Sequence, residues 1–449
     1  MSGMTAGADS PLPPGRTGLP YFGEMARMLR DSFAFIEDGA RRHGPIFRTR
    51  LLGRNTAIVT GPEAAALFID EDRVARSGAM LPHIQGLFGG LSLPVMDGPA
   101  HRARKQVVMA AFTHQALAAY LPATNDLVAA CLDKVARDEQ TRMVPVLERL
   151  GMDVLCQTVL GFSPGPQLER LLADYATIMR GLVSLPLPFP GTAYARARKA
   201  LARALLVHRE NIDRHQKMPG DDGVSRMLAA REEVLRAGTD VTAGAIAVEN
   251  HHLLVAGMIV WSWLAAGIVA LHQQPALRAR LAAEVARVAA AGPVDLEGIA
   301  GMPFLGQVVD EIRRHTPVLQ LAWGRARRTF TFSGYTVPEN WMVLWGVRAS
   351  HMRPEIYAHP ERFDPGRFAP ERAEHKMHPC AFVPNGAGER LGHICAGYEL
   401  APLLVSVFLV HLVRGYSWQI PSEQDLAFDF TKAPPEPRDG LRVRLRALD

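Results

Sequence analysis

The chain has 449 residues, of which 48% are hydrophobic and 21% are charged, and its formal net charge is +5. This length allows a large buried core, and the composition is ordinary for a globular protein. Lys and Arg are spread along the chain without a dense block, which argues against nucleic-acid binding. The charge remains compatible with a mildly basic face for an acidic partner.

The four cysteines have spacings that fit neither a disulfide framework nor a zinc site. They are Cys131, Cys156, Cys380 and Cys395. No charged segment followed by an apolar one opens the chain, so we expect no signal peptide. These features predict a protein of the reducing cytoplasm, where free thiols persist.

The first two thirds of the chain read as mainly helical. Residues 1–23 predict an extended N-terminal segment, since their later part is rich in Pro and Gly. Residues 46–60 alternate well enough for a short hairpin. From about 62 to 320 the pattern is helical, with expected loops at 185–192 and 218–223.

The last third mixes strands and one helix. Residues 324–348 are rich in β-branched and aromatic residues and predict short strands. An apolar helix is expected from about 396 to 414, ending at Gly415 and kinked by Pro402. Residues 420–449 predict a final hairpin. Without repeats or an evident linker, the chain reads as one mainly α domain with a small β part.

One segment has the length of a membrane span. Residues 253–271 form a run of 19 residues without a charge. It is the only such run, and His251, His252 and His272 flank it in place of a Lys/Arg cluster. We therefore favour a buried central helix and expect no membrane span.

The strongest chemical signal is a Gly-rich loop before a single cysteine, in residues 382–401 (FVPNGAGERLGHICAGYELA). Its glycines Gly386, Gly388 and Gly392 let a backbone lie close to a flat ligand. Cys395 is expected just before a helix N-terminus, where the dipole and free N–H groups stabilise a thiolate. A thiolate is an electron-rich haem ligand that favours O–O cleavage. An inert buried cysteine is the alternative, which the loop and His393 argue against.

Several motifs stand in an order that resembles the cytochrome P-450 superfamily over nearly the whole chain. Glu311 and Arg314 (EIRR) match its Glu-x-x-Arg pair, and Arg362 in the string PERF matches the later Arg that completes a buried triad. The resemblance implies a mainly α fold with small β-sheets, a triangular helical prism around a buried haem. It also implies one haem domain over residues 1–449, haem b as cofactor, and Cys395 as axial ligand of the haem iron.

Further residues match haem contacts of that family. His101 and Lys105 (GPAHRARK) match an early helix whose basic groups meet the haem propionates, and Arg325 matches a later basic residue aimed at a propionate. His393 adds a possible donor, and Gly388 gives the haem close access. Taken one by one, the basic residues could equally be surface charges.

The cysteine loop is similar to one branch of the superfamily, the fatty-acid peroxygenases and decarboxylases. It has three extra residues between Phe382 and Cys395, as that branch has. Members of the branch use hydrogen peroxide and hold a fatty acid by an Arg-Pro pair on the long helix. Here Val255 and Ala256 stand at the matching places, so a fatty acid bound in that way is doubtful, because burying an unpaired carboxylate is costly.

The same helix lacks the acid–alcohol pair that ordinary oxygen-activating members carry after Ala-Gly. Gly257 is followed by Met258, Ile259 and Val260. The distal residues Val255, Ala256 and Gly257 are therefore expected to face an apolar substrate. Glu249, His251 and His252 could substitute as proton donors, but a polar helix start explains them equally.

The sequence thus predicts a haem-thiolate oxidoreductase, a monooxygenase or peroxygenase that oxidises a hydrophobic small molecule through an iron-oxo species. Its oxidant is hydrogen peroxide, or oxygen with a ferredoxin and reductase. The alternative is a haem-binding protein or a non-oxygenative haem enzyme, which the missing proton relay favours.

Overall fold

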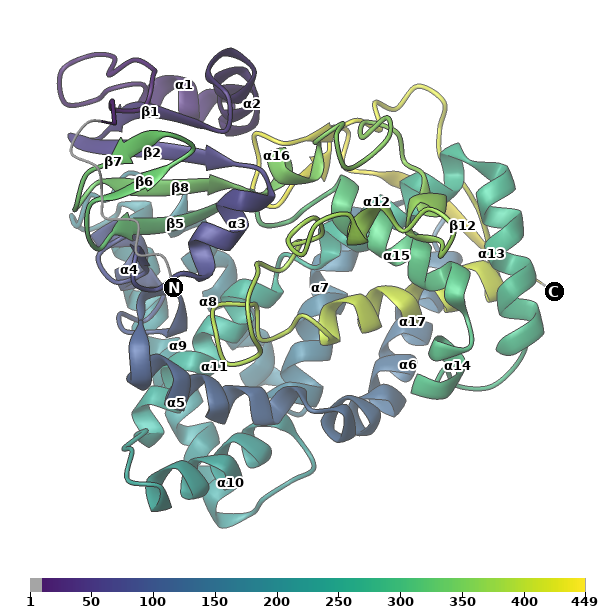
Figure 1. Ribbon diagram of the computed structural model, residues 1–449. Coiled ribbons are helices and arrows are strands. Elements are labelled where there is room, and N and C mark those ends of the chain that lie inside the picture. The colour runs from purple at the N-terminus through teal and green to yellow at the C-terminus, as the bar shows by residue number, and fades with distance from the viewer. Residues whose placement is uncertain (1–9, 449) are drawn as a thin grey trace. The chain divides into compact units, whose positions relative to one another are not determined.

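A computed structural model describes residues 10–448 of the chain (Figure 1). These residues divide into two compact units. We call the first the sheet unit: residues up to Met80, Asp310–Cys395 and Phe428–Glu436. The helical unit comprises Leu81–Val309, Ala396–Ala427 and the residues from Pro437 onward. Residues 1–9, where the extended N-terminal segment was predicted to begin, lie outside the description, and residues 10–23 contain no helix or strand, as predicted.

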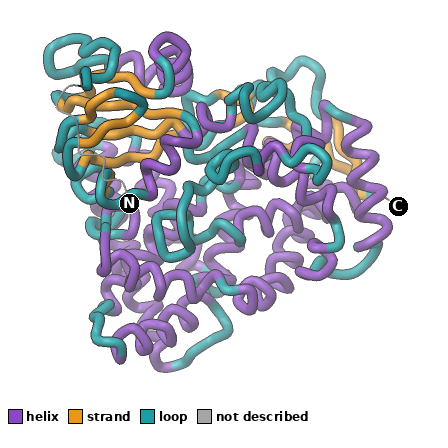
Figure 2. Tube along the Cα trace, viewed as in Figure 1, coloured by secondary structure: helices purple, strands orange, loops and turns teal. Residues whose placement is uncertain are grey.

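The sheet unit is built on a five-stranded sheet in the order β1-β2-β8-β5-β3. Its strands are β1 (Ile46–Leu51), β2 (Arg54–Thr60), β3 (Val74–Ala75), β5 (Leu321–Ala326) and β8 (Met342–Gly346). Beside it lie the hairpin of β6 (Phe330–Phe332) and β7 (Tyr335–Val337), and the helices α1 (Met25–Arg30), α2 (Ser32–His43), α3 (Pro62–Ile69) and α16 (Val347–His351). In Figure 2 the strands of this unit appear in orange as one layered group.

The predicted hairpin at residues 46–60 is confirmed. β1 and β2 pair antiparallel, with Ile46 opposite Val59. Leu52 and Gly53 between them both have positive φ, 47° and 77°, which is the geometry of a two-residue hairpin turn. The strands predicted within residues 324–348 are also confirmed, as β5 to β8.

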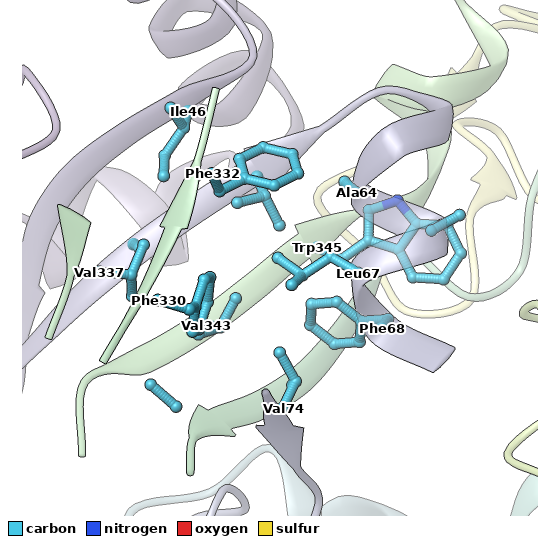
Figure 3. Close-up of a cluster of buried hydrophobic side chains, with 14 of the residues drawn as sticks. Ile46, Ala64, Leu67, Phe68, Val74, Phe330, Phe332, Val337, Val343 and Trp345 are labelled. Carbon is cyan, nitrogen blue, oxygen red and sulfur yellow. The ribbon is translucent and has the colours of Figure 1, made fainter. Parts of the chain in front are cut away.

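The core of the sheet unit lies between the sheet and α3. Phe68 of α3 and Trp345 of β8 have ring centroids 5.6 Å apart, and Val74 and Val343 pack against the same cluster (Figure 3). All five residues of β8 are buried. Val343 and Trp345 lie in this cluster and Leu344 lies in a second one, so both faces of the strand are covered, and such a strand reads as a continuous apolar run.

The helical unit holds most of the helices of the described chain. They are α4 (Pro82–Leu87), α5 (Gly98–Met109), α6 (His114–Arg137), α7 (Met143–Val154), α8 (Pro166–Leu182), α9 (Ala193–Lys217), α10 (Gly223–Arg236), α11 (Ala243–Gly257), α12 (Trp261–Gln273), α13 (Pro275–Val288), α14 (Leu296–Ala300) and α17 (Leu400–Gly415). Helix α15 (Pro303–His315) begins in this unit and continues into the sheet unit from Asp310. The predicted helical stretch and its loops at 185–192 and 218–223 are confirmed.

The apolar run at residues 253–271 forms the end of α11 and most of α12. Taken together, Ala243–Gln273 is long and apolar enough to cross a membrane, but 72% of its most apolar window is buried inside the protein. Every residue of α12 from Trp261 to Leu271 is buried. The segment thus packs as the core helix that the sequence favoured.

The junction of α11 and α12 is a local tightening of the helix. The N–H of Met258 still bonds four residues back to Leu254, at 3.1 Å, whereas those of Val260 and Trp263 bond three residues back, to Gly257 at 3.3 Å and to Val260 at 2.9 Å. A short stretch of this kind within a helix often marks a functional position.

Two expectations for the C-terminal part are corrected. Pro402 does not kink the last helix. It is the third residue of α17, which begins at Leu400. The N–H groups of a helix's first turn have no acceptor within the helix, so a proline is tolerated there. The final hairpin over 420–449 is replaced by a three-stranded sheet, β4-β12-β9, in which β12 (Arg442–Ala447) pairs with β9 (Tyr416–Gln419) and with β4 (Thr141–Arg142). Only the short pair of β10 (Phe428–Asp429) and β11 (Glu436–Pro437) lies within the predicted hairpin.

Candidate functional site

The cysteine loop of the sheet unit holds the one exposed thiol of the chain. All four cysteines are free, but Cys156 and Cys380 are buried and Cys131 is half-buried. Burial raises the pKa of Cys131 to about 11 and raises that of Cys156 further, so these thiols stay protonated and inert. Only Cys395 is accessible to a ligand.

Glycine is required at one place in that loop. Gly388 has a φ of +107°, and a Cβ there would lie 2.5 Å from Cγ2 of Ile69 in α3. Any side chain would therefore both strain the backbone and clash with Ile69. The loop can run this close to α3 only because residue 388 has no side chain.

Two hydrogen bonds hold the ends of the loop, one within the loop itself and one to a residue of α16. The N–H of Cys395 donates to the carbonyl of Asn385 at 2.9 Å. At the start of the loop, the N–H of Val383 donates to Nε2 of the buried His351 at 3.0 Å. Burial lowers the pKa of His351 to about 3, so its ring is neutral and Nε2 can accept.

Arg313 of α15 braces the centre of the loop. Its Nη2 donates to Oδ1 of Asn385 at 2.6 Å, and its Nη1 pairs with Asp310 at 2.7 Å. Its guanidinium also lies 5.2 Å from the ring centroid of Phe382. Burial lowers the pKa of Arg313, and the negative charges of Asp310 and Cys395 act in the opposite direction. Arg313 therefore places a cation near Cys395. It also holds Asn385, whose carbonyl accepts the hydrogen bond from Cys395.

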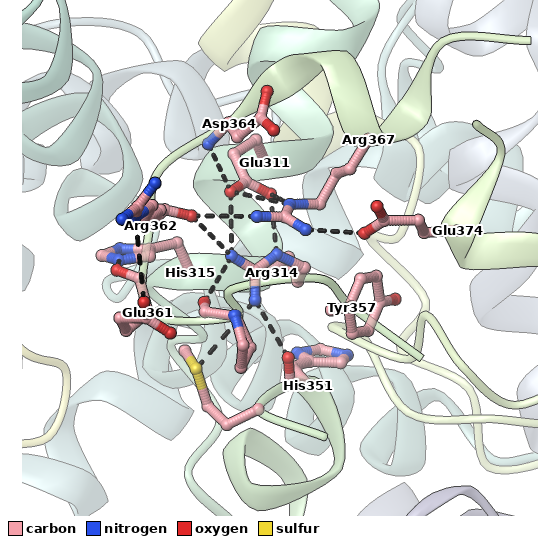
Figure 4. A network of polar contacts seen from close by, with 12 residues as sticks. Glu311, Arg314, His315, His351, Tyr357, Glu361, Arg362, Asp364, Arg367 and Glu374 are labelled. Atoms are coloured by element: carbon pink, nitrogen blue, oxygen red, sulfur yellow. Dashed lines mark hydrogen bonds and ion pairs between the residues drawn. The ribbon is translucent and has the colours of Figure 1, made fainter. Parts of the chain in front are cut away.

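Glu311, two residues before Arg313 on α15, is the centre of a buried ion network (Figure 4). Its carboxylate accepts from Nε and Nη2 of Arg314, at 2.7 and 2.8 Å, and from Nε of Arg367, at 3.2 Å. The backbone N–H of Asp364 adds a bond of 2.8 Å. A second carboxylate, Glu374, pairs with Nη1 of Arg367 at 2.6 Å. Charges that are paired and fully hydrogen-bonded in this way can be buried.

The prediction that Arg362 completes this triad is wrong. Its side chain is 71% exposed and contacts Glu361, and only its carbonyl reaches the network, where it accepts from Arg314 and Arg367. The second guanidinium is that of Arg367, which is 0% exposed. The N–H of Asp364, between these two arginines, donates to Glu311, and the side chain of Arg367 points toward the same carboxylate (Figure 4).

The other predicted residues of the sheet unit lie in separate places. His393 lies in the cysteine loop, and its Nε2 is 3.6 Å from Oε1 of Glu71. Arg325, on β5, donates from Nη1 to Oδ1 of Asn340 at 2.5 Å and from Nε to the carbonyl of Ser77 at 3.2 Å. Neither contact was predicted.

In the helical unit, α5 buries two basic side chains on one face. His101 and Lys105 are four residues apart, and only 1% and 3% of their surfaces are exposed. Burial, with a smaller contribution from the charge of Lys105, lowers the pKa of His101 to about 4. Two buried basic groups of this kind suit an anionic ligand.

The distal stretch predicted on α11 is apolar but incompletely covered. Val255 is 4% exposed, whereas Ala256 to Val260 are all half-buried. Gly257 packs directly against Leu155, where a Cβ would overlap the Leu155 side chain. The helical unit thus has a run of five partly exposed apolar residues where α11 meets α12.

Comparison with known proteins decides the family. A description of the family "Cytochrome P450" matches residues 13–437. The chain belongs to the cytochrome P450 family. It is 29% identical over 443 residues to cytochrome P450 120 of Synechocystis sp., which covers 98% of this chain and 97% of that protein. Abscisic acid 8'-hydroxylase 2 of Oryza sativa subsp. indica is 28% identical over 458 residues, covering 97% of this chain and 86% of that protein.

Solved structures agree with the mainly α fold predicted. Cyanobacterial CYP120A1 with retinoic acid bound has a TM-score of 0.88 and 30% identity, and the match covers 98% of this chain and 100% of that chain. Cytochrome P450EX alpha with myristic acid has a TM-score of 0.80 at 23% identity, covering 98% of this chain and 100% of that chain, which shows a common fold.

Members of this family bind haem b, and the residues of this P450 fit such a group. An accessible thiol at Cys395 offers the soft ligand, and the glycine at 388 leaves the loop without a side chain where it runs closest to α3. His101 and Lys105 offer buried basic groups for the propionates. Each unit by itself thus presents residue types that would suit a haem, a thiol for the iron in one and buried basic groups for propionates in the other.

Three residues of the site escaped the sequence reasoning. Arg367 had a visible signal, because Pro365-Gly-Arg-Phe368 repeats the Pro-x-Arg-Phe pattern of Pro360-Glu-Arg-Phe363 five residues later. Arg313 and Asn385 had none, since their contact joins positions 72 residues apart.

Replacing Arg367 should be far more destabilising than replacing Arg362. Arg367→Ala leaves Glu311 and Glu374 short of a buried partner, which we expect to lower the free energy of unfolding by about 3–5 kcal/mol. Arg362→Ala removes an exposed side chain and should change it by no more than about 0.5 kcal/mol. Urea unfolding of both variants measures the difference, and equal effects would contradict the assignment. If Arg367→Ala does not fold, Arg367→Lys, which keeps the charge, supplies the comparison.

Proposed function

We propose that this P450 is a monooxygenase that hydroxylates an apolar terpenoid or polyene carboxylic acid. In this proposal Cys395 would bind the haem iron through its sulfur, and His101, Lys105, Arg325 and His393 would serve the propionates. When bound, the haem supplies the oxygen activation, which the thiolate assists by donating electron density. The protein supplies ligation, substrate orientation and exclusion of water.

The apolar stretch of α11 carries this proposal. Val255 is buried, and its neighbours Leu253 and Leu254 are buried as well. An unpaired carboxylate would be costly against these side chains, so the acid group of a substrate must lie elsewhere. What this stretch can hold is the hydrocarbon part of the substrate, which is the part that hydroxylation requires.

The relatives support the substrate class. The structure with 30% identity has retinoic acid bound, and a curated relative at 28% identity is an abscisic acid 8'-hydroxylase. Both compounds named there are carboxylic acids with a terpenoid carbon skeleton. The structures that hold fatty acids, such as the myristic acid complex, are less similar, at 23% identity.

The proposed electron source is a ferredoxin-type protein with its reductase. The net charge of +5 would favour an acidic partner of this kind. We place the protein in the cytoplasm, in keeping with four free cysteines and with an apolar helix that is mostly buried.

A peroxide-driven enzyme is the second candidate, because the cysteine loop carries the insertion found in the peroxygenase branch. The two candidates differ in oxidant, so product analysis separates them. We expect hydroxylated retinoic acid with oxygen, ferredoxin, reductase and NAD(P)H, and little product with hydrogen peroxide alone. Product from peroxide alone at an equal or higher rate would contradict the proposal. No product in either system would favour a haem-binding or non-oxygenative role.

Introducing a cation at Val255 should change the ligand class. In Val255→Arg, a guanidinium on α11 can pair with a carboxylate, which we expect to create myristic acid binding with an affinity gain on the order of 10-fold or more. A spectral titration of the haem with myristic acid measures this, and Val255→Met serves as a control of similar bulk without charge. An unchanged titration in Val255→Arg would count against the assigned place of this residue.

A further inference from the structure

Helix α11 carries a buried carboxylate that faces a histidine. Glu249 is 1% exposed, and its Oε1 accepts from the N–H of Leu93 at 3.1 Å and from Nη1 of Arg104 at 3.3 Å. Its Oε2 lies 3.2 Å from Nδ1 of His252, one turn further along the helix. An ionised carboxylate can only accept, so Nδ1 of His252 is assigned as the donor in that bond.

The two adjacent histidines of α11 have different roles. His251 is buried, and both of its nitrogens are used, Nδ1 with the hydroxyl of Tyr175 at 2.9 Å and Nε2 with the carbonyl of Leu87 at 2.9 Å. Burial lowers the pKa of His251 to about 4, so it remains a neutral structural residue. The side chain of His252 is 17% exposed, and its Nε2 has no hydrogen-bond partner among residues 10–448.

The position of His252 on the helix connects it with the partly exposed run. His252 and Ala256 are four residues apart and therefore lie on the same face of α11. Ala256 begins the half-buried stretch that ends at Val260. Ile259 and Val260 in this stretch carry no ionisable proton, and His252 is a side chain on this face of α11 that can donate one.

We propose that His252, oriented by Glu249, supplies a proton during oxygen activation in this P450. The inference rests on the proposed monooxygenase function. The reaction is RH + O₂ + NAD(P)H + H⁺ → ROH + H₂O + NAD(P)⁺, so one oxygen atom enters the substrate and the other leaves as water. With a proton on each ring nitrogen, Nε2–H of His252 would give a proton to the oxygen atom that leaves as water, and the ring would regain a proton from solvent at its exposed edge. The bond from Nδ1 to Glu249 would hold the ring in one orientation during this exchange.

The charged and titratable groups around this pair lie on α5 and α11. Glu249 pairs with His252 and, through its other oxygen, with Arg104 of α5. His101 and Lys105 also lie on α5. The charge of Glu249 raises the pKa of His101, against the larger effect of burial, which lowers it. His251 stays neutral, and the ring of Phe88, 6.0 Å from that of His252, adds no charge.

Product formed per NAD(P)H consumed tests the proposal in the full-length protein with haem bound. His252→Gln should lower this ratio on the order of 10-fold and raise hydrogen peroxide release accordingly, since general acids contribute 10²–10⁴-fold and water replaces them in part. The pH profile of the ratio should flatten, while substrate affinity stays unchanged. Glu249→Gln should give a smaller loss in the same direction. His272→Gln, at the end of α12, is the matched control and should behave as the native protein.

Two further measurements separate a proton donor from a structural residue. Placing the family's acid–alcohol pair in the variant, as Ile259→Asp with Val260→Thr, should restore the ratio in His252→Gln. Without any turnover, diethyl pyrocarbonate labelling read by mass spectrometry should modify His252 but not His251. A bulky N-substituted imidazole bound to the haem iron should protect His252 and leave His272 reactive.

Several results would overturn the inference. They are an unchanged ratio and pH profile in His252→Gln, a change in substrate affinity alone, or labelling of His252 that the iron-bound imidazole does not affect. If the native protein forms no product with oxygen and electron donors, the proposed function fails, and the inference fails with it. Product from the native protein with an unaffected His252→Gln overturns the inference alone.

Discussion

The ion network around Glu311 is the interaction on which the sheet unit depends. One carboxylate is shared by Arg314 and Arg367, and both guanidiniums bond in addition to backbone carbonyls of the segment from His351 to Arg362. Because all three side chains are fully buried, none can leave its partners without exposing an unpaired charge to the interior. The network therefore fixes irregular backbone that neither a helix nor a strand would hold.

This network also determines where the cysteine lies. Arg313, next to Arg314 on α15, bonds to Asn385, and the carbonyl of Asn385 receives the N–H of Cys395. His351, whose carbonyl accepts from Arg314, receives the N–H of Val383 on its ring. Two adjacent arginines of one helix turn thus stabilise a Gly-rich loop that has few side chains of its own. The position of a thiolate can be held in this way even though the loop contains no regular structure.

The sequence was sufficient where local chemistry decides the structure. The Gly-rich loop, the hairpin at residues 46–60 and the apolar core helix could all be predicted, because turn residues and apolar periodicity act over short distances. The sequence predicted Arg362, but two Pro-x-Arg-Phe strings follow one another, and only the contacts of Glu311 show that Arg367 is the buried one. Whether Pro402 would kink α17 depended on where that helix begins. The contact of Arg313 with Asn385 joins positions 72 residues apart, which no spacing rule indicates.

The central claim is that Cys395, held by this network, binds the haem iron as a thiolate. The difference spectrum between the reduced protein and its carbon monoxide complex tests it most directly. The native protein should show the Soret band at the position that gives the family its name, and Cys395→Ser should lose that band. Cys380→Ser, which changes a buried thiol of the same unit, should keep it. A native protein without the band, or a Cys395→Ser variant that retains it, would contradict the account.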